Sequence, residues 1–126
     1  MRITLWVFVS LFGLVLSMSL SASNKNEGSV SMSNDVIVLD VRTAKEFEES
    51  HVKSAQNIDI LESDFENKTS KLDKSKNYKL YCRSGNRSGR ALDIMKTAGF
   101  KNVENLGSLK QATEKLKQTC EGKQPC

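Results

Sequence analysis

One stretch of the sequence combines a cysteine with the residue types that activate a thiol. In "YCRSGNRSGR", residues 81–90, Cys82 comes just before two arginines, Arg83 and Arg87. The small or turn-forming residues among them are Ser84, Gly85, Asn86 and Ser88. Such a loop can turn its backbone N–H groups toward one anion, and a helix that begins there adds the positive end of its dipole. We therefore expect Cys82 to have a lowered pKa, to be nucleophilic at neutral pH, and to lie where the loop holds an anionic substrate.

The spacing of this loop separates two kinds of thiol chemistry. Tyrosine phosphatases and related enzymes use C-x5-R, in which the loop surrounds a tetrahedral phosphate. Here Arg87 is five places after Cys82, which gives C-x4-R, and Ser88 occupies the sixth place. The shorter loop favours a single sulfur over phosphate or arsenate. A small buried cysteine that merely closes a strand is the structural alternative.

The surrounding sequence alternates between strand-like and helix-like segments. Apolar, β-branched "VIVLDV" at residues 36–41 suits a buried strand, and Thr43 with Glu46 forms a capping box for the helix that follows. Further expected strands are "AQNIDI", "YKLYC" and "KNVENL", and further expected helices are "LESDFENKTSKL", "RSGRALDIMKTAG" and "SLKQATEKLKQT". This order predicts an α/β domain with a mainly parallel small sheet flanked by helices on both faces. Cys82 would then stand at the carboxyl end of a strand, where such sheets bind ligands.

The first residues have the layout of a secretory signal peptide. A short basic start precedes the apolar run "ITLWVFVSLFGLVL" and small residues follow it. We expect residues 1–23 to be removed, with cleavage after Ser21 or Ser23, and the protein to be periplasmic or secreted. An uncleaved membrane anchor is the alternative, but the run is shorter than a spanning helix needs. Residues 24–35 read as a flexible lead-in, residues 36–119 as the folded domain and residues 120–126 as a tail.

Composition and cysteine spacing bear on three questions: nucleic-acid binding, disulfide pairing and metal binding. The net charge is +4 and the basic residues are interleaved with acidic ones, so we expect no nucleic-acid binding. In an oxidising compartment the simplest pairing of the three cysteines is Cys120 with Cys126, which leaves Cys82 free. The single histidine, His51, is far from the cysteines in sequence, so we expect no metal or cofactor.

The sequence resembles the single-domain rhodaneses, the thiosulfate sulfurtransferases, and particularly their small periplasmic members. The resemblance rests on "VIVLDVRTAKEFEESHVKSAQNI" and "YCRSGNRSGRALDIMKTAGFKNVENLGSL", in this order. It implies a rhodanese-like fold in which Cys82 takes the outer sulfur of thiosulfate as a persulfide, releases sulfite, and passes the sulfur to cyanide or a thiol. The backbone amides of residues 83–88 would bind the anionic groups, and Arg83 and Arg87 would orient the sulfonate.

The resemblance also implies structural roles and leaves alternatives open. It makes Asp40 and Arg42 a buried polar pair near the site and His51 a scaffold residue rather than a catalyst. We expect a monomer that does not associate with a membrane once the signal peptide is removed. The alternatives are a non-catalytic rhodanese-like binding module and a thiol–disulfide carrier that uses Cys82 with Cys120 or Cys126.

Overall fold

The computed structural model describes residues 35–126; the expected signal peptide and nearly all of the lead-in lie outside the described residues. The strands are β1 (Val36–Asp40), β2 (His51–Val52), β3 (Gln56–Asn57), β4 (Asn77–Cys82), β5 (Val103–Ser108) and β6 (Cys120–Glu121). The helices are α1 (Ala44–Glu49), α2 (Phe65–Ser70), α3 (Asn86–Thr97) and α4 (Leu109–Leu116). Strands and helices therefore alternate along most of the described chain, as the sequence predicted.

The main sheet has four parallel strands in the order β3-β1-β4-β5. Leu39 pairs with Leu80 at its centre, and Cys82 pairs with Ser108 at its edge. Because all four strands run the same way, their carboxyl ends lie along one edge. Asp40, Cys82 and Ser108, each the last residue of its strand, are thereby brought to that edge.

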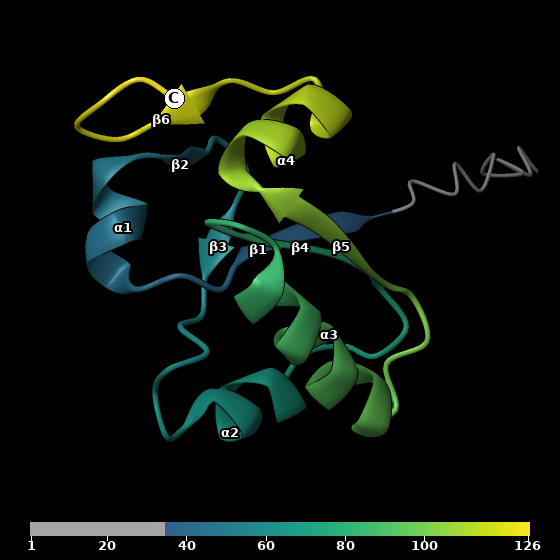
Figure 1. Ribbon diagram of the computed structural model, residues 1–126. Coiled ribbons are helices and arrows are strands. Elements are labelled where there is room, and N and C mark those ends of the chain that lie inside the picture. The colour runs from purple at the N-terminus through teal and green to yellow at the C-terminus, as the bar shows by residue number, and fades with distance from the viewer. Residues whose placement is uncertain (1–34) are drawn as a thin grey trace, which may run out of the picture. The chain divides into compact units, whose positions relative to one another are not determined.

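Helices pack on both faces of this sheet (Figure 1). One face carries Leu39 and Leu80 and packs on Met95 of α3 and Phe65 of α2, all of them buried. The other face carries Val38 and Tyr81 and packs on α4 and β2; its further buried residues are Val52, Leu106 and Ala112. The alternation of neighbouring residues between two cores is what a strand covered on both sides requires. The predicted fold class, α/β with helices on both faces, is confirmed.

A second, two-stranded sheet lies beside the main one. Strand β6 of the tail pairs antiparallel with β2, with Val52 opposite Cys120. The tail also donates hydrogen bonds from the backbone of Lys123 and Gln124 to the carbonyls of Glu48 and Glu49, at 3.2 and 2.8 Å. Residues 119–126, which we call the tail strap, are thus hydrogen-bonded to the end of α1.

Candidate active site

The loop between β4 and α3 surrounds the sulfur of Cys82 with hydrogen-bond donors. Strand β4 ends at Cys82, which is 0% exposed, and α3 begins four residues later. The backbone N–H of Gly85 donates to Sγ at 3.0 Å, and Oγ of Ser88 lies 3.4 Å from the same atom. The sulfur therefore sits at the amino end of a twelve-residue helix, inside the loop that the sequence singled out.

Gly85 allows the chain to make this turn. Its φ is +93°, a left-handed conformation that side chains disfavour, and a Cβ at this position would meet Cα of Gly107 at 3.2 Å. Gly85 is also the residue that precedes the first helical residue of α3, and no side chain caps the helix there. The backbone N–H of Ser88, in the first turn of α3, is directed at the sulfur, together with the N–H groups of Ser84 and Gly85 that precede the helix.

Two opposing effects act on the acidity of Cys82. Burial raises the pKa of the thiol, because it disfavours a charged sulfur. Hydrogen bonds from the Ser88 hydroxyl and from the backbone N–H groups of Ser88, Ser84 and Gly85 act in the opposite direction. Together the hydrogen bonds have a larger effect than burial, so the pKa of Cys82 lies below its ordinary value. This is the direction expected for a nucleophilic cysteine.

The loop is held in place by Asn105, a residue of β5 that the sequence did not single out. Its Nδ2 donates to the carbonyl of Gly85 at 2.9 Å, and its Oδ1 accepts from the Ser88 hydroxyl at 2.7 Å. A hydroxyl has one proton, so Ser88 donates to Asn105 or to Cys82, but not to both at once. Ionisation of Cys82 favours rotation of that proton toward the sulfur. No local pattern marks Asn105, because its partners are about twenty residues away.

The two arginines of the loop have different surroundings. Arg83 is exposed and lines a cleft at this edge of the sheet. Arg87 is partly buried and forms a bidentate ion pair with Glu46 of α1, at 2.8 and 2.9 Å. The hydrogen bonds from Arg87 lower the pKa of Glu46 to about 2, despite an opposing effect of burial. The capping box of Thr43 and Glu46 is present as predicted, so Glu46 acts both in the cap and on Arg87.

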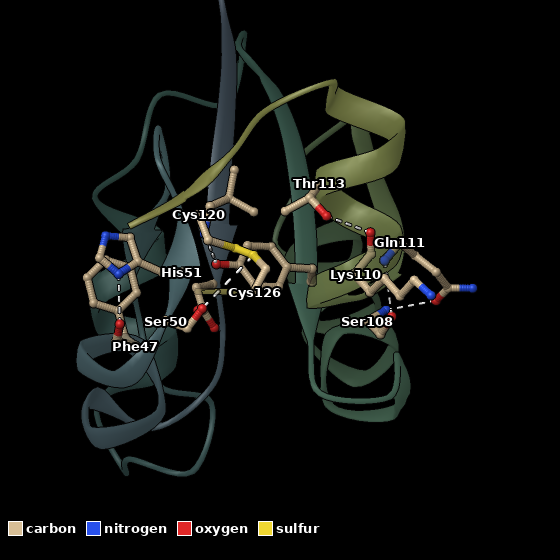
Figure 2. The surroundings of a disulfide bond; sticks show 12 residues. Phe47, Ser50, His51, Ser108, Lys110, Gln111, Thr113, Cys120 and Cys126 are labelled. Carbon is tan, nitrogen blue, oxygen red and sulfur yellow. Dashed lines mark hydrogen bonds between the residues drawn. A yellow bond between two sulfur atoms is a disulfide. The ribbon is translucent and has the colours of Figure 1, made fainter. Parts of the chain in front are cut away.

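Asp40 and Arg42 form a buried polar pair at this edge, and His51, which is half-buried, begins β2 of the second sheet. Arg42 and Asp40 make an ion pair at 2.6 Å, with side chains 8% and 0% exposed, and Arg42 also donates to the carbonyl of Ser50 at 2.5 Å. His51 stacks on Phe47 with ring centroids 3.7 Å apart, and its Nδ1 lies 2.7 Å from the Phe47 carbonyl (Figure 2). A carbonyl can only accept, so Nδ1 carries a proton that it donates there.

The cysteines divide into one disulfide and one free thiol. Cys120 and Cys126 are joined, with their Cα atoms 5.6 Å apart, and Cys82 is free. Figure 2 places the disulfide between Ser50 and the first turn of α4. Within residues 35–126, no three side chains of the types that bind metals lie together in a way that could hold an ion. In the same part of the chain, no helix has the length and apolar character needed to cross a membrane.

Comparison with known proteins identifies the family to which this chain belongs. The model of the rhodanese-like domain family matches residues 24–115, so the chain belongs to that family. The chain is 38% identical over 72 residues to the thiosulfate sulfurtransferase PspE of Escherichia coli, a match that covers 57% of this chain and 69% of PspE. The predicted family is therefore confirmed.

Solved structures with a similar fold also belong to the rhodanese-like proteins. The structure of a rhodanese with anions from Escherichia coli has a TM-score of 0.54 and 36% identity, over 60% of this chain and 89% of that one. The crystal structure of a rhodanese-like domain from Anabaena has a TM-score of 0.60 and 25% identity, over 72% of this chain and 96% of that one.

Proposed function

We propose that this protein is a thiosulfate sulfurtransferase in which Cys82 carries the transferred sulfur. The observation that carries the proposal is the set of donors around Sγ, from Gly85 and Ser88, at the amino end of α3. The similarity to PspE, a thiosulfate sulfurtransferase, supports the same reaction. A thiolate held in this way needs no general base, which agrees with the loop containing no histidine.

The reaction proceeds in two steps. The Cys82 thiolate attacks the outer sulfur of thiosulfate, and the sulfur–sulfur bond of the donor breaks, with its electron pair leaving on sulfite. Cys82 is then a persulfide. In the second step cyanide or a thiolate attacks the outer sulfur of that persulfide, and the electron pair of the broken bond restores the Cys82 thiolate. The N–H groups of residues 84–88 stabilise the sulfur anion at each stage.

The two arginines contribute differently to this reaction. Arg83 is exposed, so its guanidinium is available to the sulfonate end of thiosulfate. Arg87 adds positive charge near the sulfur, but its hydrogen bonds are made to Glu46. Cys82 itself is fully buried, so only the narrow end of a donor, such as a single sulfur atom, can reach it.

Intact mass after incubation with thiosulfate tests the proposal. The wild type is expected to gain one sulfur atom, and Cys82→Ser, which keeps the disulfide, is expected to gain none. Wild type whose Cys82 has been alkylated beforehand is the matched control and should also gain none. A folded wild type that takes up no sulfur would support a non-catalytic binding module instead. A mass that shows Cys82 joined to Cys120 or Cys126 would support a thiol–disulfide carrier.

We also propose that the protein is exported. The basic, apolar and small-residue order of residues 1–23 supports export, and a disulfide in the tail suits an oxidising compartment. Sequencing the amino terminus of the protein isolated from its source tests this. The first residue is expected to be Ala22 or Asn24, and a chain that still begins at Met1 would contradict the proposal.

A further inference from the structure

The guanidinium of Arg87 is already occupied by an anion of the protein itself. Arg87 lies in the first turn of α3, five places after Cys82. Its Nη1 and Nη2 donate to the two carboxylate oxygens of Glu46, at 2.8 and 2.9 Å. A guanidinium presents a planar fork of donors that fits a carboxylate or a tetrahedral oxyanion. Glu46 therefore takes the edge of Arg87 that an anionic ligand would otherwise use.

Arg87 is also close enough to the active site to respond to the charge of the sulfur. The hydrogen bonds to Glu46 raise the pKa of Arg87 most, burial opposes them, and the negative charges of Glu46, Cys82 and Asp59 act in the same direction as the hydrogen bonds. Among the described residues, Asp59 makes no hydrogen bond to Arg87, and its Oδ1 accepts from the backbone N–H of Leu61 at 2.8 Å. Glu46 is therefore the group that holds the guanidinium.

Glu46 is held by a second set of donors. Its Oε2 accepts from the backbone N–H and the hydroxyl of Thr43, at 3.1 Å each, so the carboxylate is in position before a ligand arrives. The side chains of Arg87 and Glu46 are 22% and 25% exposed, so an anion from solution can compete for the guanidinium. Arg83, in contrast, is exposed and makes no hydrogen bond or ion pair with its side chain in the part of the chain that the structure describes.

We infer that Glu46 is a positioning residue that weakens the hold of the site on oxyanions, because it keeps Arg87 from the oxygen atoms of thiosulfate and of the departing sulfite. Sulfite must leave before an acceptor can reach the persulfide of Cys82, so tight binding of its oxygen atoms would slow turnover. An interaction made equally to bound substrate and transition state lowers KM without raising kcat. This inference rests on the proposed function, because it concerns the leaving group of that reaction.

Glu46→Gln tests the inference, because glutamine also fits a capping box and the substitution removes the charge that binds Arg87. Sulfate is the probe, since it has the oxygen atoms of thiosulfate but no outer sulfur to transfer. The inhibition constant of sulfate against thiosulfate is expected to fall about tenfold in Glu46→Gln, the value of one charge-assisted hydrogen bond. The KM for thiosulfate should also fall, whereas kcat should not rise.

Two further variants show whether Arg87 is responsible. Arg87→Ala, added to Glu46→Gln, should abolish the gain in sulfate affinity. Asp59→Asn removes a charge that acts on Arg87 only through space, and it should change the inhibition constant less than about twofold. The inference is overturned by the absence of a gain in Glu46→Gln, by a gain that persists without Arg87, or by an equal gain in Asp59→Asn.

Failure of the proposed function would look different. A folded wild type that transfers no sulfur from thiosulfate, even to cyanide, would contradict that function. Calorimetric titration with sulfate then still decides about Glu46, because it requires no turnover. Tighter binding of sulfate to Glu46→Gln than to the wild type supports the role of Glu46, and equal binding contradicts it.

Discussion

Arg87 of the active-site helix and Glu46 of α1 form a bidentate ion pair, with N–O distances of 2.8 and 2.9 Å. The same carboxylate accepts hydrogen bonds from the backbone and the hydroxyl of Thr43, at 3.1 Å each. One acidic side chain therefore fixes the start of α1 and also holds Arg87, an arginine in the first turn of α3. Two segments about forty residues apart in the sequence are joined at the site in this way.

The ion pair predicts a pH-dependent contribution to stability. Glu46→Gln is expected to lower the free energy of unfolding by about 1–2 kcal/mol at neutral pH, because the pair is partly buried and charge-assisted. The hydrogen bonds from Arg87 lower the pKa of Glu46 from 4.5 to about 2 in the folded protein. The contribution is therefore complete above about 4.5 and is lost as the pH falls toward about 2.

Urea unfolding of the wild type and Glu46→Gln across that range measures the effect. The difference between the two proteins should shrink steadily as the solution is acidified. A difference that is the same at neutral and acidic pH would mean that the charge of Glu46 is not what stabilises the fold.

Much of the fold follows from local sequence. The apolar run before Asp40 forms strand β1, as expected. Thr43 and Glu46 form the predicted capping box at the start of α1. Cys82 lies between a strand and a helix, which was also expected. These features depend on neighbours within a few residues, which is the range over which propensity and capping act. Gly99, the last residue of the segment "RSGRALDIMKTAG" that was expected to be helical, has a φ of +98° just after the helix.

The parts that sequence reasoning missed depend on distant partners. Asn105 meets Gly85 and Ser88 only because β5 lies beside β4 in the sheet. The short strand β6 exists only because β2 offers it a partner, and two residues carry too little pattern to reveal a strand. Glu46 was recognised as part of a cap, but its pairing with Arg87 requires the packing of α1 near α3.

Asn105 is expected to influence the acidity of Cys82. In Asn105→Asp the new carboxylate cannot donate to the carbonyl of Gly85, and it adds a negative charge near the sulfur. Both changes disfavour the thiolate, so the pKa of Cys82 should rise by about one unit. The pH dependence of alkylation by iodoacetamide measures it. Asn102→Asp, which adds the same charge at the opposite end of β5, is the control, and an equal shift in both variants would contradict a specific role for Asn105.

The buried pair of Asp40 and Arg42 is expected to matter far more than a surface pair. Asp40→Ala leaves a buried guanidinium without its counter-ion and should cost about 3 kcal/mol or more. Glu104→Gln breaks the more exposed pair with Lys79 and should cost about 1 kcal/mol or less. Chemical denaturation of both variants gives the comparison. Similar losses in the two would show that burial of the first pair has no particular consequence.

The disulfide is expected to act locally. It closes a loop with a sequence separation of only six residues, so replacing both Cys120 and Cys126 by serine should cost about 2 kcal/mol or less. Hydrogen exchange should become faster at the amides of Lys53, Lys123 and Gln124, which hold the tail strap in place. Amides of β1 and β4 should keep their protection. Equal loss of protection throughout the domain would show that the disulfide supports the whole fold.

Hydrogen bonds from the loop lower the pKa of Cys82, although its burial alone would raise that pKa. Titration of the thiolate by its ultraviolet absorbance, with Cys82→Ser as the blank, tests this most directly. The pKa of Cys82 is expected to lie below the ordinary value of 9.0, and sulfur uptake from thiosulfate is expected to rise with pH at the same midpoint. A midpoint at or above 9.0 in the folded protein would contradict it.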